Sequence, residues 1–160
     1  MKRHSALIPL SRDHHNGLVQ ASWLRRAAAD GDAAAWLAAA REFVEFFRNE
    51  ERVHLRDEEE ALFPLFLRHV QSQPAPLREA RLQHVQLEGF VRKLEIAVAA
   101  SIVDRETLDA AGGLLDAHIR LEERQLFPLI EELVPDDELR RLRLAERNAT
   151  CAVRRAPLTS

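Results

Sequence analysis

Apolar residues recur at steps of three and four along most of this chain, the spacing that gathers side chains on one face of an α-helix. The pattern runs through four long stretches, residues 10–29, 33–69, 77–100 and 104–134. No stretch shows the strict alternation of apolar and polar residues that is typical of a half-buried strand. The pattern therefore predicts four amphipathic helices and no sheet.

Residues that cannot continue a helix separate these stretches. Asp30-Gly31-Asp32 follows the first, and Gln73-Pro74-Ala75-Pro76 precedes the third, where the prolines remove backbone donors. Asp104 is a residue type preferred at a helix N-cap, and it precedes the fourth stretch. Pro135 ends the fourth helix and precedes a short fifth one, which we expect over residues 137–148.

Long amphipathic helices joined by short connections are typical of helix bundles. We therefore expect an all-α fold, an up-down-up-down four-helix bundle with a short C-terminal fifth helix. The length fits one domain, residues 1–160, with its core in residues 7–133 and the short helix and a tail in residues 136–160.

Two prolines and two glycines fall inside the predicted helices. Pro64 and Pro128 each remove a helix hydrogen bond, so the second and fourth helices should bend or end at corresponding places. Gly112 and Gly113 lie within the fourth helix, where a glycine costs about 1 kcal/mol relative to alanine. They indicate close helix packing, a late start of the helix, or an access point to a buried site.

Composition supports a helical globular protein and narrows its partners. The hydrophobic share is 46%, the charged share is 31%, and the net charge of −3 gives no reason to expect nucleic acid as a partner. Cys151 is the only cysteine, which excludes an intramolecular disulfide and favours a reducing compartment without a redox role for the thiol. No apolar run approaches the roughly 20 residues that span a bilayer, and the start lacks a signal-peptide core. We expect a cytoplasmic protein with no membrane partner.

One charged and apolar segment occurs twice. HLRDEEEALFP, from His54 to Pro64, returns as HIRLEERQLFP, from His118 to Pro128, with seven of eleven positions identical. In both copies a glutamate follows the histidine by four residues, so imidazole and carboxylate lie on the same helix face. A single such pair is more often a solvated ion pair than a metal site.

The surrounding pattern changes that interpretation. Each pair continues the apolar stripe of its helix, and burying an ionised carboxylate without a partner costs several kcal/mol. The first and third helices also place one histidine each on their apolar faces. One layer of the bundle should therefore hold six polar side chains: His14, His54, Glu58, His84, His118 and Glu122.

Imidazole and carboxylate together suit iron, manganese or zinc, and no thiolate belongs to the set. Two glutamates from facing helices can each bridge two ions, with two histidines left for each ion. Such a centre keeps open positions for solvent, an oxo bridge or a small molecule. The residues thus indicate a dinuclear carboxylate site inside a bundle.

These motifs resemble the hemerythrin-like family, which carries the HHE cation-binding domain. The resemblance rests on the helix-one Asp13-His14, the duplicated HxxxEE followed by LFP, and the single His84 between them, and it spans about residues 7–133. It implies two iron ions, which an oxo bridge can join, with zinc or manganese as substitutes. It places the ligands on the six residues named above, with Glu58 and Glu122 as bridges.

Several neighbours keep more than one interpretation. Oxygen-carrying members of the family have a second histidine four residues after the third-helix histidine, and here that place is Glu88. Glu88 is a further metal ligand, a hydrogen-bond partner of His84, or a surface residue. His15 is an alternative to His14 or a residue at the rim. Asp13 fixes a histidine tautomer, caps the helix or is solvated, while Glu59 and Glu123 are expected to be solvated or paired with arginines.

Three functions follow from this site. The first is a di-iron binding protein that handles a small ligand such as O2, NO or peroxide. The second is a di-iron enzyme with peroxide-decomposing or oxidase-like activity, which Glu88 would favour because a carboxylate-rich site oxidises more readily. The third is an iron- or oxygen-dependent regulator, which would require a protein partner that the sequence does not identify.

Overall fold

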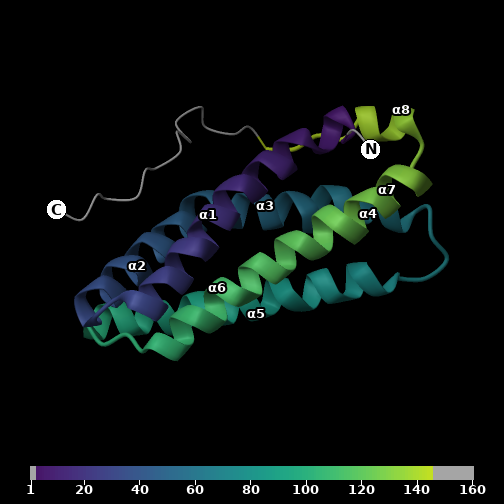
Figure 1. Cartoon of the computed structure of the whole chain (residues 1–160). Helices are drawn as coiled ribbons and strands as arrows, with labels where there is room; N and C mark the ends of the chain where they lie inside the picture. The colour runs from purple at the N-terminus through teal and green to yellow at the C-terminus, as the bar shows by residue number, and fades with distance from the viewer. Residues whose placement is uncertain (1–2, 146–160) are drawn as a thin grey trace.

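The computed structural model describes residues 3–145, and this part of the chain contains helices and turns but no strand (Figure 1). A short 3-10 turn, Ser5–Leu7, leads into α1. The α-helices are α1 (Ile8–Asp30), α2 (Ala33–Phe46), α3 (Arg52–Asp57), α4 (Phe63–Leu67), α5 (Ala75–Ala100), α6 (Arg105–Leu121), α7 (Phe127–Leu133) and α8 (Asp136–Arg140). The predicted all-helical fold is confirmed.

Three π-helical turns join some of these helices into longer rods. Phe47–Glu51 joins α2 to α3, Glu58–Leu62 joins α3 to α4, and Glu122–Leu126 joins α6 to α7. The second and fourth predicted helices are therefore single rods with local changes of winding. Such π turns are rare in helices and are frequent at functional sites.

Aspartate side chains cap the N-termini of α2 and α6. Asp32 accepts a hydrogen bond from the backbone N–H of Ala35 at 3.0 Å, and Asp104 accepts one from the N–H of Thr107 at 2.7 Å. Each bond satisfies a donor that the first helical turn leaves free. The N-cap predicted at Asp104 is thus confirmed.

The prolines do not end the helices. Pro64 and Pro128 stand in the first turns of α4 and α7, directly after the π turns Glu58–Leu62 and Glu122–Leu126. A proline is tolerated there because the first turn of a helix needs no N–H donor from it. The irregularities occur at corresponding places in the two rods, as the repeat predicted.

The long segments lie side by side (Figure 1). α1 packs against α2 and α6, and α5 packs against the same two helices. These contacts are compatible with the predicted up-down-up-down order. No helix in residues 3–145 is long and apolar enough to cross a membrane.

Two apolar clusters fill the interior. The first cluster gathers side chains from α1, α2, α5 and α6, and includes Phe43, Phe47, Leu87 and Leu115. The second gathers Leu7 and Leu10 with side chains that follow the metal-motif glutamates, such as Phe63 and Phe127. Along every long helix the buried histidine comes between residues of one cluster and residues of the other. A polar layer therefore separates two dry regions.

The fifth helix is shorter than predicted. α8 ends at Arg140, because Arg141 and Leu142 turn the chain with bonds to carbonyls only three residues back, Glu138 at 3.1 Å and Leu139 at 3.0 Å. The chain then runs to Ala145, whose N–H donates to the carboxylate of Asp57 at 3.0 Å. The rest of the predicted helix, residues 146–148, and Cys151 lie outside the described residues.

The two glycines of α6 differ in their surroundings. A Cβ on Gly112 would lie 2.8 Å from the carbonyl oxygen of Ala21 and 3.1 Å from Cβ of Leu24, both on α1. A Cβ on Gly113 would meet nothing within 4 Å. Gly112 thus permits the close approach of α1 and α6. α6 already begins at Arg105, so neither glycine marks a late helix start.

This difference gives a paired prediction. Gly112→Ala should lower the free energy of unfolding by about 1–3 kcal/mol, because backbone on α1 must move to admit the methyl group. Gly113→Ala should raise it by about 0.5–1 kcal/mol, because alanine loses less conformational entropy in a helix. Urea unfolding of the metal-free proteins measures both, and equal effects at the two positions would contradict the packing assigned to Gly112.

Candidate metal centre

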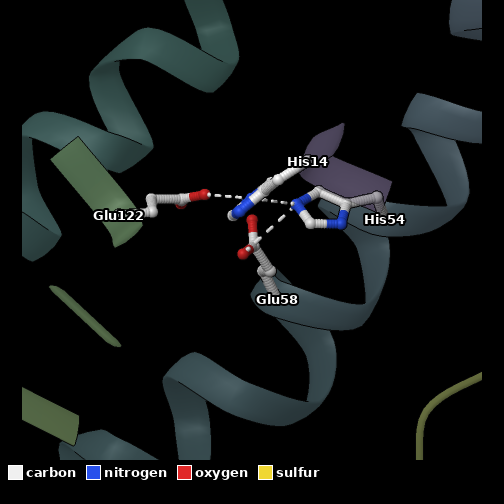
Figure 2. Close-up of side chains that lie close together, drawn as sticks. All are labelled: His14, His54, Glu58 and Glu122. Carbon is white, nitrogen blue, oxygen red and sulfur yellow. Dashed lines mark hydrogen bonds and ion pairs between the residues drawn. The ribbon is translucent and has the colours of Figure 1, made fainter. Parts of the chain in front are cut away.

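Six buried side chains meet between the two apolar clusters. They form two groups of four, and one donor atom from each member of a group lies within 4.8 Å of the others. Figure 2 shows the first group. The first group is His14, His54, Glu58 and Glu122, and the second is Glu58, His84, His118 and Glu122. The two carboxylates belong to both groups.

The distances show how each carboxylate stands between the groups. Glu58 lies 3.4 Å from Nε2 of His54 and 3.3 Å from Nε2 of His84. Glu122 lies 3.0 Å from Nε2 of His14 and 3.5 Å from Nε2 of His118. All four histidines thus direct the same ring nitrogen at carboxylates shared by both groups, an arrangement that suits metal binding.

The outward nitrogens of the four rings are also held. Nδ1 of His14 lies 2.7 Å from Glu123, and Nδ1 of His84 lies 2.9 Å from Glu59. Nδ1 of His54 lies 3.3 Å from Asp13, and Nδ1 of His118 lies 3.2 Å from Oε1 of Gln83. Because these oxygens accept hydrogen bonds, a neutral ring carries its proton on Nδ1 and keeps the lone pair of Nε2 for a metal.

Glu59 and Glu123 do more than the sequence indicated. They pair with arginines as expected, Glu59 with Arg81 at 2.9 Å and Glu123 with Arg3 at 2.6 Å. Each also holds a histidine on a neighbouring helix. The two consecutive glutamates in each motif could have indicated this second role. Adjacent helix positions point about 100° apart, so the second glutamate reaches a different neighbouring helix from the first.

The two halves of the centre are related by an approximate twofold pattern. Phe127 stacks on His14 with 5.3 Å between ring centroids and 17° between planes, and Phe63 stacks on His84 with 5.8 Å and 11°. The phenylalanine of each Leu-Phe-Pro therefore packs on the histidine that is held by the glutamate four residues before it. Asp13 and Gln83 break the pattern, because one is charged and the other neutral.

Charge coupling in the metal-free layer shifts its pKa values. Burial lowers the pKa of His14, but hydrogen bonds to Glu122 and Glu123 outweigh it and raise the pKa to about 9. The pKa of His84 likewise rises to about 11 against burial, through Glu122, Glu58 and Glu59. Burial dominates at His118 and lowers its pKa to about 4. Without metal, protons on the histidines balance the buried carboxylates.

Several nitrogen and oxygen atoms of the two groups have no hydrogen-bond partner within the described residues. They are both carboxylate oxygens of Glu58, Oε1 of Glu122, and Nε2 of His84 and His118. Buried polar atoms are almost always satisfied, so such a cluster needs an explanation. Metal ions bound in the two groups would explain it, because nitrogen and carboxylate oxygen are donors that iron, manganese and zinc accept.

Two candidate ligands do not join the centre. Glu88 is partly exposed, lies 3.5 Å from Arg52, and belongs to neither group. This places it as a surface residue, the third of the interpretations given above. His15 is exposed on α1 while His14 is buried, because one step along the helix turns the side chain away from the core. Asp13 is the hydrogen-bond acceptor for His54.

Glu51 is a buried carboxylate that the sequence argument missed. Its residue is 3% exposed, and its Oε1 has no hydrogen-bond partner in the described chain. It precedes His54 by three residues and Glu58 by seven, so it continues the same helical stripe. That spacing could have indicated that Glu51 is buried. However, Glu50-Glu51 is one of several acidic runs, and nothing else in the sequence distinguishes it from the exposed ones.

A family model for the hemerythrin HHE cation-binding domain matches residues 7–130. The chain belongs to the hemerythrin HHE cation-binding family. The match covers both motif copies and all six residues of the two groups. Comparison with curated proteins and with solved structures gives no significant match. Family membership and the two groups together make this a metal-binding protein.

The outer carboxylates of this hemerythrin-family site can be tested directly. Glu59→Ala and Glu123→Ala should each weaken metal binding by about 10–100-fold, because an unanchored imidazole pays an orientation cost on binding. Glu60→Ala is the matched control, since Glu60 is exposed on the same rod as Glu59. Competition with a chelator measures the affinities, and an equal affinity in all three variants would exclude the anchoring role.

Stability of the metal-free protein should fall as the pH rises above neutral. An unfolded histidine releases its proton near pH 6.5, whereas folded His14 and His84 keep theirs up to pKa values of about 9 and about 11. At these two histidines the folded chain then binds more protons than the unfolded chain, so the stability that they contribute is full below about pH 6.5 and is lost as the pH rises through their folded pKa values.

Urea midpoints of the metal-free protein measured from about pH 6.5 to about pH 9.5 should show this decline. The metal-loaded protein is the control, because metal replaces the protons on these rings and removes the alkaline loss. A midpoint that stays constant or rises for the metal-free protein would contradict the assignment.

Proposed function

We propose that this hemerythrin-family protein holds two iron ions and binds a small ligand such as O2, NO or peroxide at them. The observation that carries the proposal is the pair of buried four-residue groups that share Glu58 and Glu122. His14 and His54 would hold one ion, and His84 and His118 the other, with the two glutamates as bridges. Zinc or manganese would occupy the same donors as substitutes.

Each ion would have two imidazoles and two bridging carboxylates from the protein, which leaves coordination positions for an exogenous molecule. The apolar clusters on both sides limit access by bulk water. A cavity of about 600 Å³ is lined by His84 and Glu59 and offers a route from solvent. When bound, iron would supply the redox chemistry, while the chain orients the imidazoles and keeps the layer dry.

Peroxide turnover is the weaker alternative. The sequence favoured it because Glu88 would enrich the centre in carboxylate, and Glu88 instead pairs with Arg52 at the surface. The small-ligand function needs no further carboxylate at that position.

The centre should bind two iron ions per chain after iron loading. His14→Ala should lose at least one ion, while His15→Ala, which changes the exposed neighbour, should keep both. Metal analysis of the purified full chain gives the stoichiometry. Fewer than two ions in the unchanged protein, or equal loss in both variants, would refute the proposed centre.

The small-ligand function requires a second measurement on the same samples. The optical spectrum of the reduced protein should change on exposure to air and return on deoxygenation. An irreversible change would instead show oxidation of the centre and favour the alternative function. Glu60→Ala, with its carboxylate exposed, controls for non-specific iron.

A further inference from the structure

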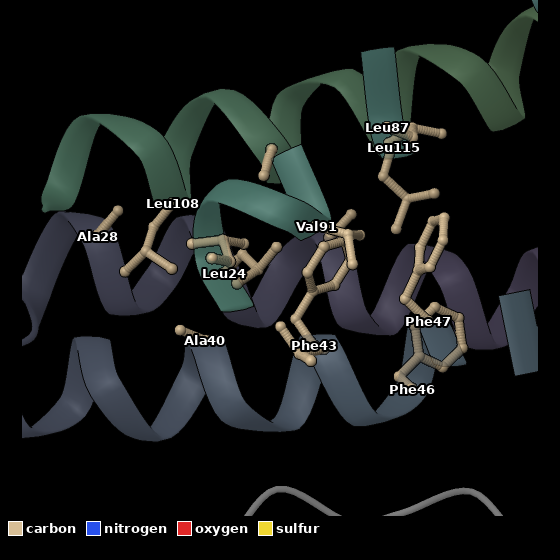
Figure 3. Close-up of a cluster of buried hydrophobic side chains, with 14 of the residues drawn as sticks. Leu24, Ala28, Ala40, Phe43, Phe46, Phe47, Leu87, Val91, Leu108 and Leu115 are labelled. Carbon is tan, nitrogen blue, oxygen red and sulfur yellow. The ribbon is translucent and has the colours of Figure 1, made fainter. Parts of the chain in front are cut away.

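The two halves of the metal layer differ one helical turn away from the ligands. The two motif copies are 64 residues apart, so the position that corresponds to Glu51 in the second copy is Leu115. His14 and His84 are 70 residues apart, so the position that corresponds to Gly17 is Leu87. Leu87 and Leu115 are fully buried members of the apolar cluster drawn in Figure 3. One side therefore has two leucines where the other has a glycine and a carboxylate.

Glu51 lies close to the His14 and His54 side of the centre. It precedes His54 by one turn, and its Oε2 would be 3.8 Å from a Cβ on Gly17, which follows His14 by one turn. Burial raises the pKa of Glu51, while the charges of His54 and His14 act to lower it. The carboxylate is thus near both histidines of the first group without belonging to that group of donors.

Packing alone does not account for this residue. A buried polar atom without a partner destabilises a fold. Leu115 shows that an apolar side chain fills the related position in the same bundle. Glu51 also ends the π turn Phe47–Glu51, and the related stretch of α6 is regular α-helix. A local change of winding and an unsatisfied oxygen coincide at one residue beside one half of the centre.

We propose that Glu51 positions solvent or a small ligand on the ion held by His14 and His54. The ion held by His84 and His118 has no such carboxylate among the described residues, because Leu115 occupies the corresponding position. This rests on the proposed two-metal function. The two ions then differ in their surroundings although their protein donors are the same types. Glu51 acts through the bound solvent or ligand and is a positioning residue.

Three variants of the full chain test the proposal. Glu51→Leu copies the other half, Glu51→Gln keeps the shape and removes the charge, and Glu60→Gln removes an exposed carboxylate from the same rod. Each is loaded with ⁵⁷Fe, and its metal content, Mössbauer spectrum and chelator competition are measured beside the unchanged protein.

The unchanged protein should hold two ions with two distinct quadrupole doublets. Glu51→Leu should move one doublet toward the other, leave the second in place, and weaken one of the two binding steps by about 10–100-fold. Glu51→Gln should shift the same doublet by less, and Glu60→Gln should shift neither. The metal-free Glu51→Leu protein should melt no lower than the unchanged chain, because an unsatisfied carboxylate has been replaced by an apolar side chain.

Two outcomes distinguish a failure of the role of Glu51 from a failure of the proposed two-metal function. Two ions with both doublets unchanged in Glu51→Leu and Glu51→Gln would overturn the role of Glu51 and leave the proposed function standing. Fewer than two ions in the unchanged protein would overturn both. If Glu51→Leu does not fold, Glu51→Gln decides by the same shift of one doublet.

Discussion

The cost of burying charge governs this molecule. Glu58 and Glu122 have no exposed surface, and they lie in a layer with four imidazoles between two apolar clusters. Two adjacent carboxylates in a medium of low polarity repel one another and lose their hydration, so the fold requires cations among them. Protons on the histidines meet this need in the metal-free chain, and metal ions would meet it with better geometry.

The outer shell of polar side chains makes that arrangement rigid. Nδ1 of every histidine in the layer forms a hydrogen bond to a side-chain oxygen. Two of those oxygens belong to glutamates that also form ion pairs with arginines. The stacked phenylalanines Phe63 and Phe127 fix the ring planes. Because Phe127 stacks on His14 and Glu123 holds its Nδ1, the inward nitrogen of this ring has little freedom, and little entropy remains to be lost when it binds.

The sequence predicted the helices and the six converging side chains because both depend on regular spacing. A histidine and a glutamate four residues apart share a helix face whatever the rest of the chain does. The sequence did not predict the roles of Glu59, Glu123 and Gln83, since their partners lie on other helices and depend on how the bundle is packed. The π turns were not predicted, because no residue type requires such a turn. The end of α8 depends on two short backbone bonds that no residue type requires.

The interlaced outer carboxylates have a consequence for how such a centre can arise. The motif copy that contributes His54 to the first group also supplies Glu59, which holds His84 of the second group. The copy that contributes His118 to the second group also supplies Glu123, which holds His14 of the first. Neither copy with its own partner helix completes a metal position. A shorter chain with one copy would have to pair with another molecule of itself to complete either group of four. The internal repeat therefore achieves within one chain what a symmetric dimer would achieve with two, and it frees residues such as Glu51 and Leu115 to differ where a true dimer would be forced to keep them the same.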